Sequence, residues 1–207
     1  MHIETITVGP LMVNSYIVAC DATNEAAVID PGEEEDKILQ KIGEMGARVK
    51  YILLTHGHVD HLGAVAEMQQ ATGAEICIHK NDEPFVENAG VQASFFDLRV
   101  PAPFKIDHYV KDGDELQVGE LTFSVLETPG HSPGGVCYLC GDSLFSGDTL
   151  FQQSIGRTDL PGGVHRQLLD SIGKKLLILP EKTKVYPGHG PATTIGEEKR
   201  LNPFLVL

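Results

Sequence analysis

The sequence predicts an α/β fold with β-sheets in the centre and helices outside. Two observations lead to this prediction. Short apolar runs rich in β-branched residues alternate with amphipathic helical segments, and the alternation occurs in both halves of the chain without a close internal repeat. The 22 glycines and 12 prolines are typical of many strands joined by shaped loops. A chain of 207 residues is long enough for one full core, so we expect a single domain over residues 1–207.

In the first half, we expect three short strands separated by turns, then a helix, a buried strand, a second helix and another strand. The first helix has apolar residues at helical spacing, and the second ends at Gly73, a common helix terminator. The expected strands cover 3–8, 14–20, 26–30, 49–54 and 75–78, and the expected helices cover 34–45 and 62–72.

Residues 81–105 show the least regular pattern, with four phenylalanines and three prolines. A long irregular segment in a compact domain is often functional. Two interpretations stay open: the segment forms a wall of a substrate cleft, or it simply packs over the core.

The second half again alternates between strands and helices. The helix expected near residue 170 places four large aliphatic side chains on one face. We expect a strand pair around 111–114, strands at 120–126, 135–140, 143–146 and 184–186, a helix over 164–177 and a short helix from residue 196.

The stretch THGHVDH, residues 55–61, directly follows the apolar run 49–54 and carries four potential metal ligands: His56, His58, Asp60 and His61. Imidazole nitrogens and carboxylate oxygens are the ligands of zinc and its first-row neighbours. The first two histidines stand two apart, so they share a side of an extended chain. The next two follow as the chain turns into a helix and can aim at a second point. The spacing favours two adjacent metals over a polar surface turn.

Three further candidates stand at strand ends beside glycine or proline, which shape and stiffen the loop: His131, Asp148 and His189. His79 also ends a strand, but an isolated histidine there is more typical of a hydrogen-bonded structural group. Asp30 precedes Pro31-Gly32 and is most simply a turn residue, with a supporting role near the site as the alternative.

Composition and hydropathy make some functions less favoured. A net charge of −13 and a pI near 5.0 disfavour nucleic-acid binding, which needs clustered cations. No apolar run approaches the roughly 20 residues that span a bilayer, and no targeting segment is evident, so we expect a cytoplasmic protein without a membrane partner. The four cysteines fit that compartment. Cys137 and Cys140 form a CxxC inside a strand, where they would face opposite ways, so buried structural thiols are expected.

THGHVDH, His131, the SGD containing Asp148 and the PGHG containing His189 resemble the metallo-β-lactamase superfamily, in order and over nearly the whole chain. The resemblance implies a four-layer αββα sandwich with the metals at the rim between two sheets. It also implies a division of the seven ligands. One metal would take His56, His58 and His131, the other would take Asp60, His61 and His189, and Asp148 would bridge them.

Residues 145–163, FSGDTLFQQSIGRTDLPGG, are similar to the glyoxalase II-like branch, whose enzymes hydrolyse a glutathione thioester. The resemblance implies a small-molecule thioester substrate, attacked by a metal-bridging hydroxide. It implies two divalent ions, zinc first and iron or manganese as alternatives. Asp60 and Asp148 would be the catalytic carboxylates, and Arg157 would hold a substrate carboxylate, with an exposed structural arginine as the alternative.

The chain departs from that branch in two ways. Asp159 replaces the family's nearby tyrosine, and only 18 residues follow His189, so the helical domain that completes the glutathione site is not expected. Gly156–Asp159, GRTD, also resembles the persulfide dioxygenases, in which two histidines and a carboxylate hold a single Fe(II). A metal-bound module without catalytic activity is the third alternative.

Overall fold

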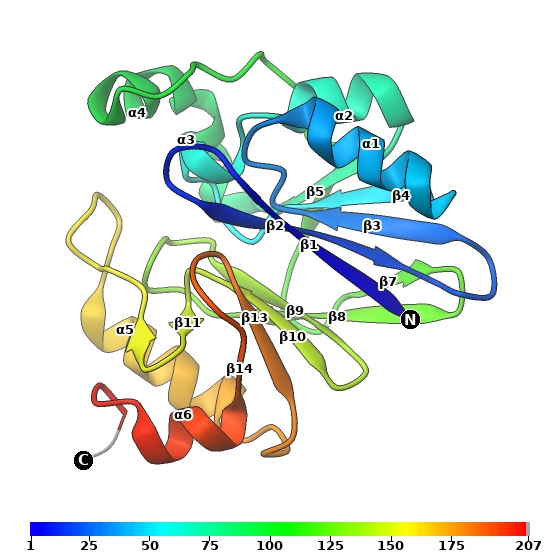
Figure 1. Ribbon diagram of the computed structural model, residues 1–207. Coiled ribbons are helices and arrows are strands. Elements are labelled where there is room, and N and C mark those ends of the chain that lie inside the picture. The colour runs from blue at the N-terminus through cyan, green and yellow to red at the C-terminus, as the bar shows by residue number, and fades with distance from the viewer. Residues whose placement is uncertain (206–207) are drawn as a thin grey trace.

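The computed structural model describes residues 1–205, in which two six-stranded sheets are covered by helices on their outer sides (Figure 1). The first sheet has the order β1-β2-β3-β4-β5-β6, with antiparallel pairing up to β3 and parallel pairing from there on. Its strands are β1 (His2–Val8), β2 (Val13–Ala19), β3 (Glu25–Ile29), β4 (Arg48–Leu53), β5 (Glu75–His79) and β6 (His108–Val110).

The second sheet has the order β14-β13-β10-β9-β8-β7, in which only the β10–β13 pair is parallel. A separate hairpin, β11–β12, follows β10 in the chain. The strands are β7 (Glu115–Val118), β8 (Leu121–Glu127), β9 (Val136–Cys140), β10 (Ser143–Gly147), β11 (Leu150–Phe151), β12 (Ser154–Ile155), β13 (Lys184–Pro187) and β14 (Thr193–Thr194).

Helices lie on both outer sides of the sheets. In Figure 1, α1 and α2 lie beside the first sheet, whereas α5 and α6 lie beside the second. The helices are α1 (Glu35–Met45), α2 (Val65–Thr72), α3 (Glu83–Glu87), α4 (Ala89–Phe96), α5 (His165–Ser171) and α6 (Ile195–Leu201); the 3₁₀ turns are η1 (Val59–His61) and η2 (Lys80–Asp82), and η3 (Ile172–Leu176) is a π-helix.

Successive side chains of each strand face opposite sides of its sheet. This alternation produces three hydrophobic cores between the four layers. In β2, Ile17 joins the core under α1 and α2, while Tyr16 and Val18 join the core between the sheets. In β10, Phe145 faces the core between the sheets and Leu144 faces the core under α5. A one-residue shift in register would exchange these faces, so burial on both sides fixes the strand positions. The predicted four-layer sandwich is confirmed.

Two element predictions were wrong. The segment 81–105 holds η2, α3 and α4 before it becomes irregular, and 111–114 is the turn between β6 of the first sheet and β7 of the second rather than a strand pair. The helix predicted over 62–72 starts later than expected, because residues 62–64 form a turn between η1 and α2 and the chain becomes α-helical only at Val65. The cysteine prediction is confirmed, since all four thiols are buried and free, with Cys137 and Cys140 in different cores. Within residues 1–205, no helix is both long and apolar enough to cross a bilayer.

The two sheets meet at one rim. Val136 donates its backbone N–H to Thr55 O at 2.8 Å, and Asn14 donates to Gly188 O at 2.7 Å. An isolated bridge also pairs Val13 with His189. At this rim, a strand of each sheet is therefore hydrogen-bonded to a loop that leaves the other sheet.

Candidate metal centre

The structure brings together all seven side chains that the sequence predicted as ligands. They come from four loops and the turn η1, and they lie at the rim where the sheets meet. His56 and His58 follow β4, Asp60 and His61 lie in η1, His131 follows β8, Asp148 follows β10, and His189 follows β13.

A first group contains His56, His58 and His131, whose ligand atoms lie within 4.8 Å of one another. All three side chains are buried. Nδ1 of His58 lies 2.9 Å from Nε2 of His131, although the two residues are 73 positions apart in the chain. Three imidazoles from distant loops therefore converge on one point.

A second group contains Asp60, His61 and His189. Oδ2 of Asp60 lies 3.4 Å from Nε2 of His189 and 3.6 Å from Nε2 of His61. This group provides one carboxylate and two imidazoles, also a donor set suited to zinc, iron or manganese.

Asp148 lies between the two groups. Its Oδ2 atom is 3.6 Å from Nε2 of His131 and 3.6 Å from Nε2 of His189, and its Oδ1 atom is 3.5 Å from Nε2 of His61. A single carboxylate thus faces histidines of both groups.

Several polar atoms of this cluster have no hydrogen-bond partner within the described part of the chain. Among them are Nε2 of His56, Nε2 of His61 and Oδ1 of Asp148, all buried. An unsatisfied buried polar atom costs about 1–3 kcal/mol. A bound cation would satisfy such atoms, so the residues present fit a metal centre.

Four of the five histidines use Nδ1 for a separate hydrogen bond, which leaves Nε2 directed to the centre. This arrangement fixes the orientation and tautomer of a metal-binding imidazole. The partners are Thr55 Oγ1 for His56 at 3.1 Å, Asp30 Oδ2 for His61 at 3.0 Å, Arg157 O for His131 at 2.7 Å and Leu11 O for His189 at 3.0 Å.

Asp30 is more than the turn residue that the sequence favoured. It is buried, with a φ of 47°, and its carboxylate accepts hydrogen bonds from Thr55 N at 2.8 Å and Thr55 Oγ1 at 2.6 Å in addition to its contact with His61. The alternative of a supporting role near the site is therefore the better one. Asp82, which the sequence did not single out, is likewise buried. It is hydrogen-bonded to the loop that carries His56 and His58 and to the loop that carries His131. His79 pairs with Glu127, as expected of a structural histidine.

Burial and neighbouring charges set the protonation of the cluster. Burial and the neighbouring His131 lower the pKa of His58 to about 3, and burial likewise lowers the pKa of His56. For His61, burial acts to lower the pKa, but the carboxylates Asp60, Asp30 and Asp148 raise it to about 10. For Asp60, burial acts to raise the pKa, but nearby histidines, His61 first, bring it below its usual range. His56 and His58 are thus neutral at pH 7, whereas His61 is a cation among carboxylates.

A cleft of about 200 Å³ opens at this cluster. Besides predicted ligands, it is lined by Leu11, Phe96 and Leu160 and by Arg157. Phe96 belongs to α4, lines this cleft and also packs against the core under α1 and α2. Segment 81–105 therefore both forms a wall of the cleft and packs over the core. The Arg157 guanidinium makes two hydrogen bonds to Asp159, at 2.8 and 2.7 Å, and both side chains are exposed.

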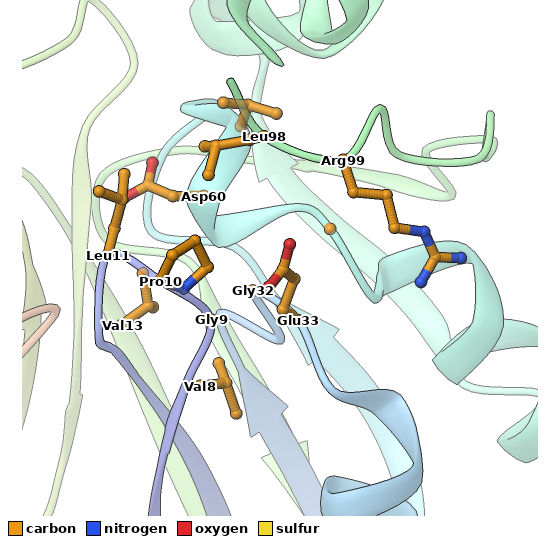
Figure 2. Close-up of a pocket in the computed structure, with 12 residues that line it drawn as sticks. Val8, Gly9, Pro10, Leu11, Val13, Gly32, Glu33, Asp60, Leu98 and Arg99 are labelled. Atoms are coloured by element: carbon orange, nitrogen blue, oxygen red, sulfur yellow. The ribbon is translucent and has the colours of Figure 1, made fainter. Parts of the chain in front are cut away.

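A second, smaller cavity of about 10 Å³ borders Asp60 from the side of the β1–β2 loop (Figure 2). It is enclosed by that loop, by Gly32 and Glu33, and by Leu98 and Arg99. The volume is close to the space that one water molecule needs. The back of Asp60 is therefore closely packed, and the larger cleft is the one that the histidines of the cluster line.

Comparison with known proteins identifies similar sequences. The family model described as Metallo-beta-lactamase superfamily matches residues 8–189. The chain is 42% identical over 208 residues to the Probable metallo-hydrolase YqgX of Bacillus subtilis, covering 99% of this chain and 98% of the relative. It is 40% identical over 209 residues to the Hydroxyacylglutathione hydrolase GloC of Haemophilus influenzae, with the same coverage.

Solved structures are similar over almost the whole chain. The BLEG-1 B3 metallo-beta-lactamase has a TM-score of 0.93 and 40% identity, covering 99% of both chains. TTHA1623, solved in a di-iron-bound form, has a TM-score of 0.90 and 42% identity, covering 98% of this chain and 100% of the other. ETHE1 from Myxococcus xanthus has a TM-score of 0.84 and 34% identity, covering 98% of this chain and 84% of the other.

Proposed function

The chain belongs to the metallo-beta-lactamase superfamily, as its sequence predicted, and on this premise we propose that it is a thioester hydrolase of the glyoxalase II-like type that uses two divalent metal ions. The superfamily supports a metal-dependent hydrolase, and GloC supports the thioester. The observation that carries the dinuclear assignment is the position of Asp148 between two groups of ligands. The cytoplasmic location expected from composition is part of the same proposal.

We assign the ligands as the sequence predicted. His56, His58 and His131 would hold one ion, and Asp60, His61 and His189 the other, with Asp148 shared. The unpartnered atoms of His56, His61 and Asp148 support this assignment. The di-iron form of TTHA1623 supports two ions, while zinc remains our first choice and manganese a further alternative.

When bound, divalent ions lower the pKa of a coordinated water from about 15.7 to near 7, so that hydroxide is available at neutral pH. The protein's own contribution is positioning. Asp60 and Asp148 line the cleft, and we propose them as the catalytic carboxylates. Asp30 and the carbonyl groups of Leu11 and Arg157 orient the imidazoles from behind.

The cleft supports a substrate with both an apolar and an anionic part. Leu11, Phe96 and Leu160 offer apolar contacts, and Arg157 offers the guanidinium that would receive a carboxylate, as in glutathione. The small volume, about 200 Å³, favours a short acyl group close to the ligands, with the rest of the substrate along the mouth.

The test combines metal analysis with a panel of thioesters that includes S-D-lactoylglutathione, with thiol release as the readout. We expect close to two metal ions per chain and thiol release by the wild type. Asp148→Ala should abolish turnover, whereas Asp170→Ala, which removes an exposed carboxylate paired with Lys174, should remain active. Wild-type turnover by Asp148→Ala would contradict the proposal. Because BLEG-1 is described as a B3 metallo-beta-lactamase, the panel should also contain a β-lactam.

The alternative function is a mononuclear Fe(II) persulfide dioxygenase. It is supported by the GRTD sequence at 156–159 and by the 34% identity to ETHE1. In that case two histidines of the first group and Asp148 would hold the iron, and the other predicted ligands would be supporting groups. One iron per chain, oxygen uptake on glutathione persulfide and no thiol release from thioesters would reverse our choice.

A further inference from the structure

Asp82 is a buried carboxylate in η2 that belongs to neither group of ligands. It accepts three hydrogen bonds. Gly57 N and Ser132 Oγ donate to its Oδ2 atom at 2.8 and 2.7 Å, and Gly134 N donates to its Oδ1 atom at 2.6 Å. Hydrogen bonds to an ionised acceptor are roughly twice as strong as those between neutral groups, so this carboxylate holds its three donors firmly.

The donors come from two different ligand loops. Gly57 stands between His56 and His58, and Ser132 directly follows His131. The two loops leave different sheets, and Asp82 itself follows β5 of the first sheet. One side chain therefore joins the loops whose imidazoles make up the first group.

The fit around Asp82 is close enough to require glycine on both loops. A Cβ atom on Gly57 would lie 2.8 Å from the carbonyl oxygen of Asp82, and one on Gly134 would lie 2.7 Å from its nitrogen and 2.8 Å from Oδ1. Neither glycine has a positive φ, so the requirement is for space rather than for backbone conformation.

We infer that Asp82 is a positioning residue that sets the relative placement of the His56–His58 loop and the His131 loop, and thereby the affinity of the first group for its metal. The inference rests on the proposed metal centre. Metal ligands must lie within about 0.2 Å of their ideal distances, so a loop held in advance binds more tightly than one that must be ordered on binding.

The substitution Asp82→Asn tests the inference. It keeps the shape of the side chain but turns one acceptor oxygen into an NH₂ group, which would oppose a backbone N–H of Gly57 or Gly134. The matched control is Glu198→Gln. Glu198 is equally buried and accepts from Gln153 N, Thr193 Oγ1 and Asn202 Nδ2, at 2.8, 2.6 and 2.8 Å, in the region of the β11–β12 hairpin and α6.

The measurement is binding of Co²⁺ to protein stripped of metal, followed by visible absorption and by competition with a chelator, together with thermal unfolding. We expect Asp82→Asn to weaken one of the two Co²⁺ sites by about 10–100-fold, the effect typical of a group that supports metal ligands. Glu198→Gln should lower the thermal stability without a change in Co²⁺ affinity. If Asp82→Asn does not fold, Ser132→Ala removes one of the three donors and should weaken the same site by a smaller factor.

The outcomes separate the inference from the proposed function. Wild-type Co²⁺ affinity in Asp82→Asn, or in Ser132→Ala should that be the variant that folds, would overturn the inference and leave the proposed function standing. An equal loss in Asp82→Asn and Glu198→Gln would overturn it also, because Asp82 would then act only through general stability. If the wild type bound no Co²⁺ at these residues, the proposed function itself would fail and the inference with it.

Discussion

Nδ1 of His61 lies 3.0 Å from Oδ2 of Asp30, and both side chains are buried. The carboxylate also accepts two hydrogen bonds from Thr55, so it is held from several sides. It joins the end of β3 to η1 and directs Nε2 of His61 toward Asp60 and Asp148. The positive φ of Asp30, 47°, is an unfavourable conformation that these contacts maintain.

Asp30→Asn should weaken metal binding by about 10–100-fold, the usual effect of losing a partner of a metal-binding histidine. The amide has one acceptor oxygen, so it cannot serve both Thr55 N and His61 Nδ1, and its NH₂ group would face a donor. The measurement is competition with a chelator by protein loaded with Zn²⁺.

The control is Asp107→Asn, because the carboxylate of Asp107 binds Gln69 and Ile76 instead of a histidine. It should keep the wild-type affinity. Equal affinities for wild type and Asp30→Asn would show that metal binding does not depend on the contact between Asp30 and His61.

Gly188 allows Asp148 to reach its position between the two groups. A Cβ atom at residue 188 would lie 2.2 Å from Oδ1 of Asp148 and 2.9 Å from Cε1 of His61. We predict that Gly188→Ala displaces both side chains and lowers thioester turnover at least 100-fold, since misplacement of about 1 Å has that effect on catalysis. Metal content and turnover are measured together.

Gly173→Ala is the matched control, because Gly173 lies in η3 and a Cβ atom there meets nothing within 4 Å. It should leave turnover unchanged and raise the stability by about 0.5–1 kcal/mol, the usual gain from alanine over glycine inside a helix. Full activity in Gly188→Ala would mean that the contact with Asp148 is not needed.

Asp159 occupies one edge of the Arg157 guanidinium, through Nε and Nη2, so a substrate carboxylate must compete with it for that edge. The hydrogen bond from Arg157 holds the pKa of Asp159 at about 2, so the competition persists at neutral pH. Because both side chains are exposed, the effect is modest. We predict that Asp159→Asn raises kcat/KM two- to fivefold for a thioester that carries a carboxylate.

The comparison substrate is a neutral thioester with the same acyl group. For this substrate, Asp159→Asn should leave kcat/KM unchanged. The gain should decrease at high ionic strength, because salt screens exposed charges. Arg157→Ala should lower kcat/KM for the anionic substrate only. If both substrates responded equally, Arg157 would have no role in recognising a carboxylate.

Much of the fold could be predicted because burial on both faces of a strand leaves a local pattern. β2 and β3 are almost entirely buried and mostly apolar, and the helix α1 repeats its apolar residues at helical spacing. The helix α4 was missed because its sequence, AGVQASFF, distributes its apolar residues around the helix and shows no such spacing. β11, β12 and β14 have two residues each, too few for any periodicity.

The seven proposed ligands could be singled out from the sequence because each has a recognisable position at or after the end of a strand, and the structure places their side chains close together. Asp30 and Asp82 could not be identified with equal certainty, because their roles depend on partners far away in the sequence. Asp30 contacts His61, 31 positions later, and Asp82 contacts Ser132, 50 positions later. An aspartate before Pro31-Gly32 has a sufficient local explanation as a turn residue, and only the fold shows the other contact.

The metal-free protein should lose stability as the pH falls from about 6.5 toward 4.5. Burial and His131 hold the pKa of His58 at about 3, whereas the unfolded chain has an ordinary value near 6.5. Between these values the unfolded chain binds a proton that the folded form excludes. The contribution of neutral His58 is therefore complete above pH 6.5 and is lost as the pH falls toward 3. Each such proton gives a slope of up to about 1.4 kcal/mol per pH unit.

This pH range separates the effect of His58 from that of His61. The pKa of His61 is raised to about 10 by the neighbouring carboxylates, so the contribution of His61 to stability is complete below pH 6.5 and is lost only as the pH rises toward 10.

Urea unfolding of the metal-free protein at several pH values between 7 and 4.5 measures the slope of stability against pH. His58→Gln cannot titrate and should reduce the slope, whereas His108→Gln, at an exposed histidine, should not. Equal slopes for wild type and His58→Gln would mean that the buried His58 side chain does not exclude protons. Excess Zn²⁺ should restore stability at pH 7 by mass action and less so at pH 5, because protons compete for the imidazoles.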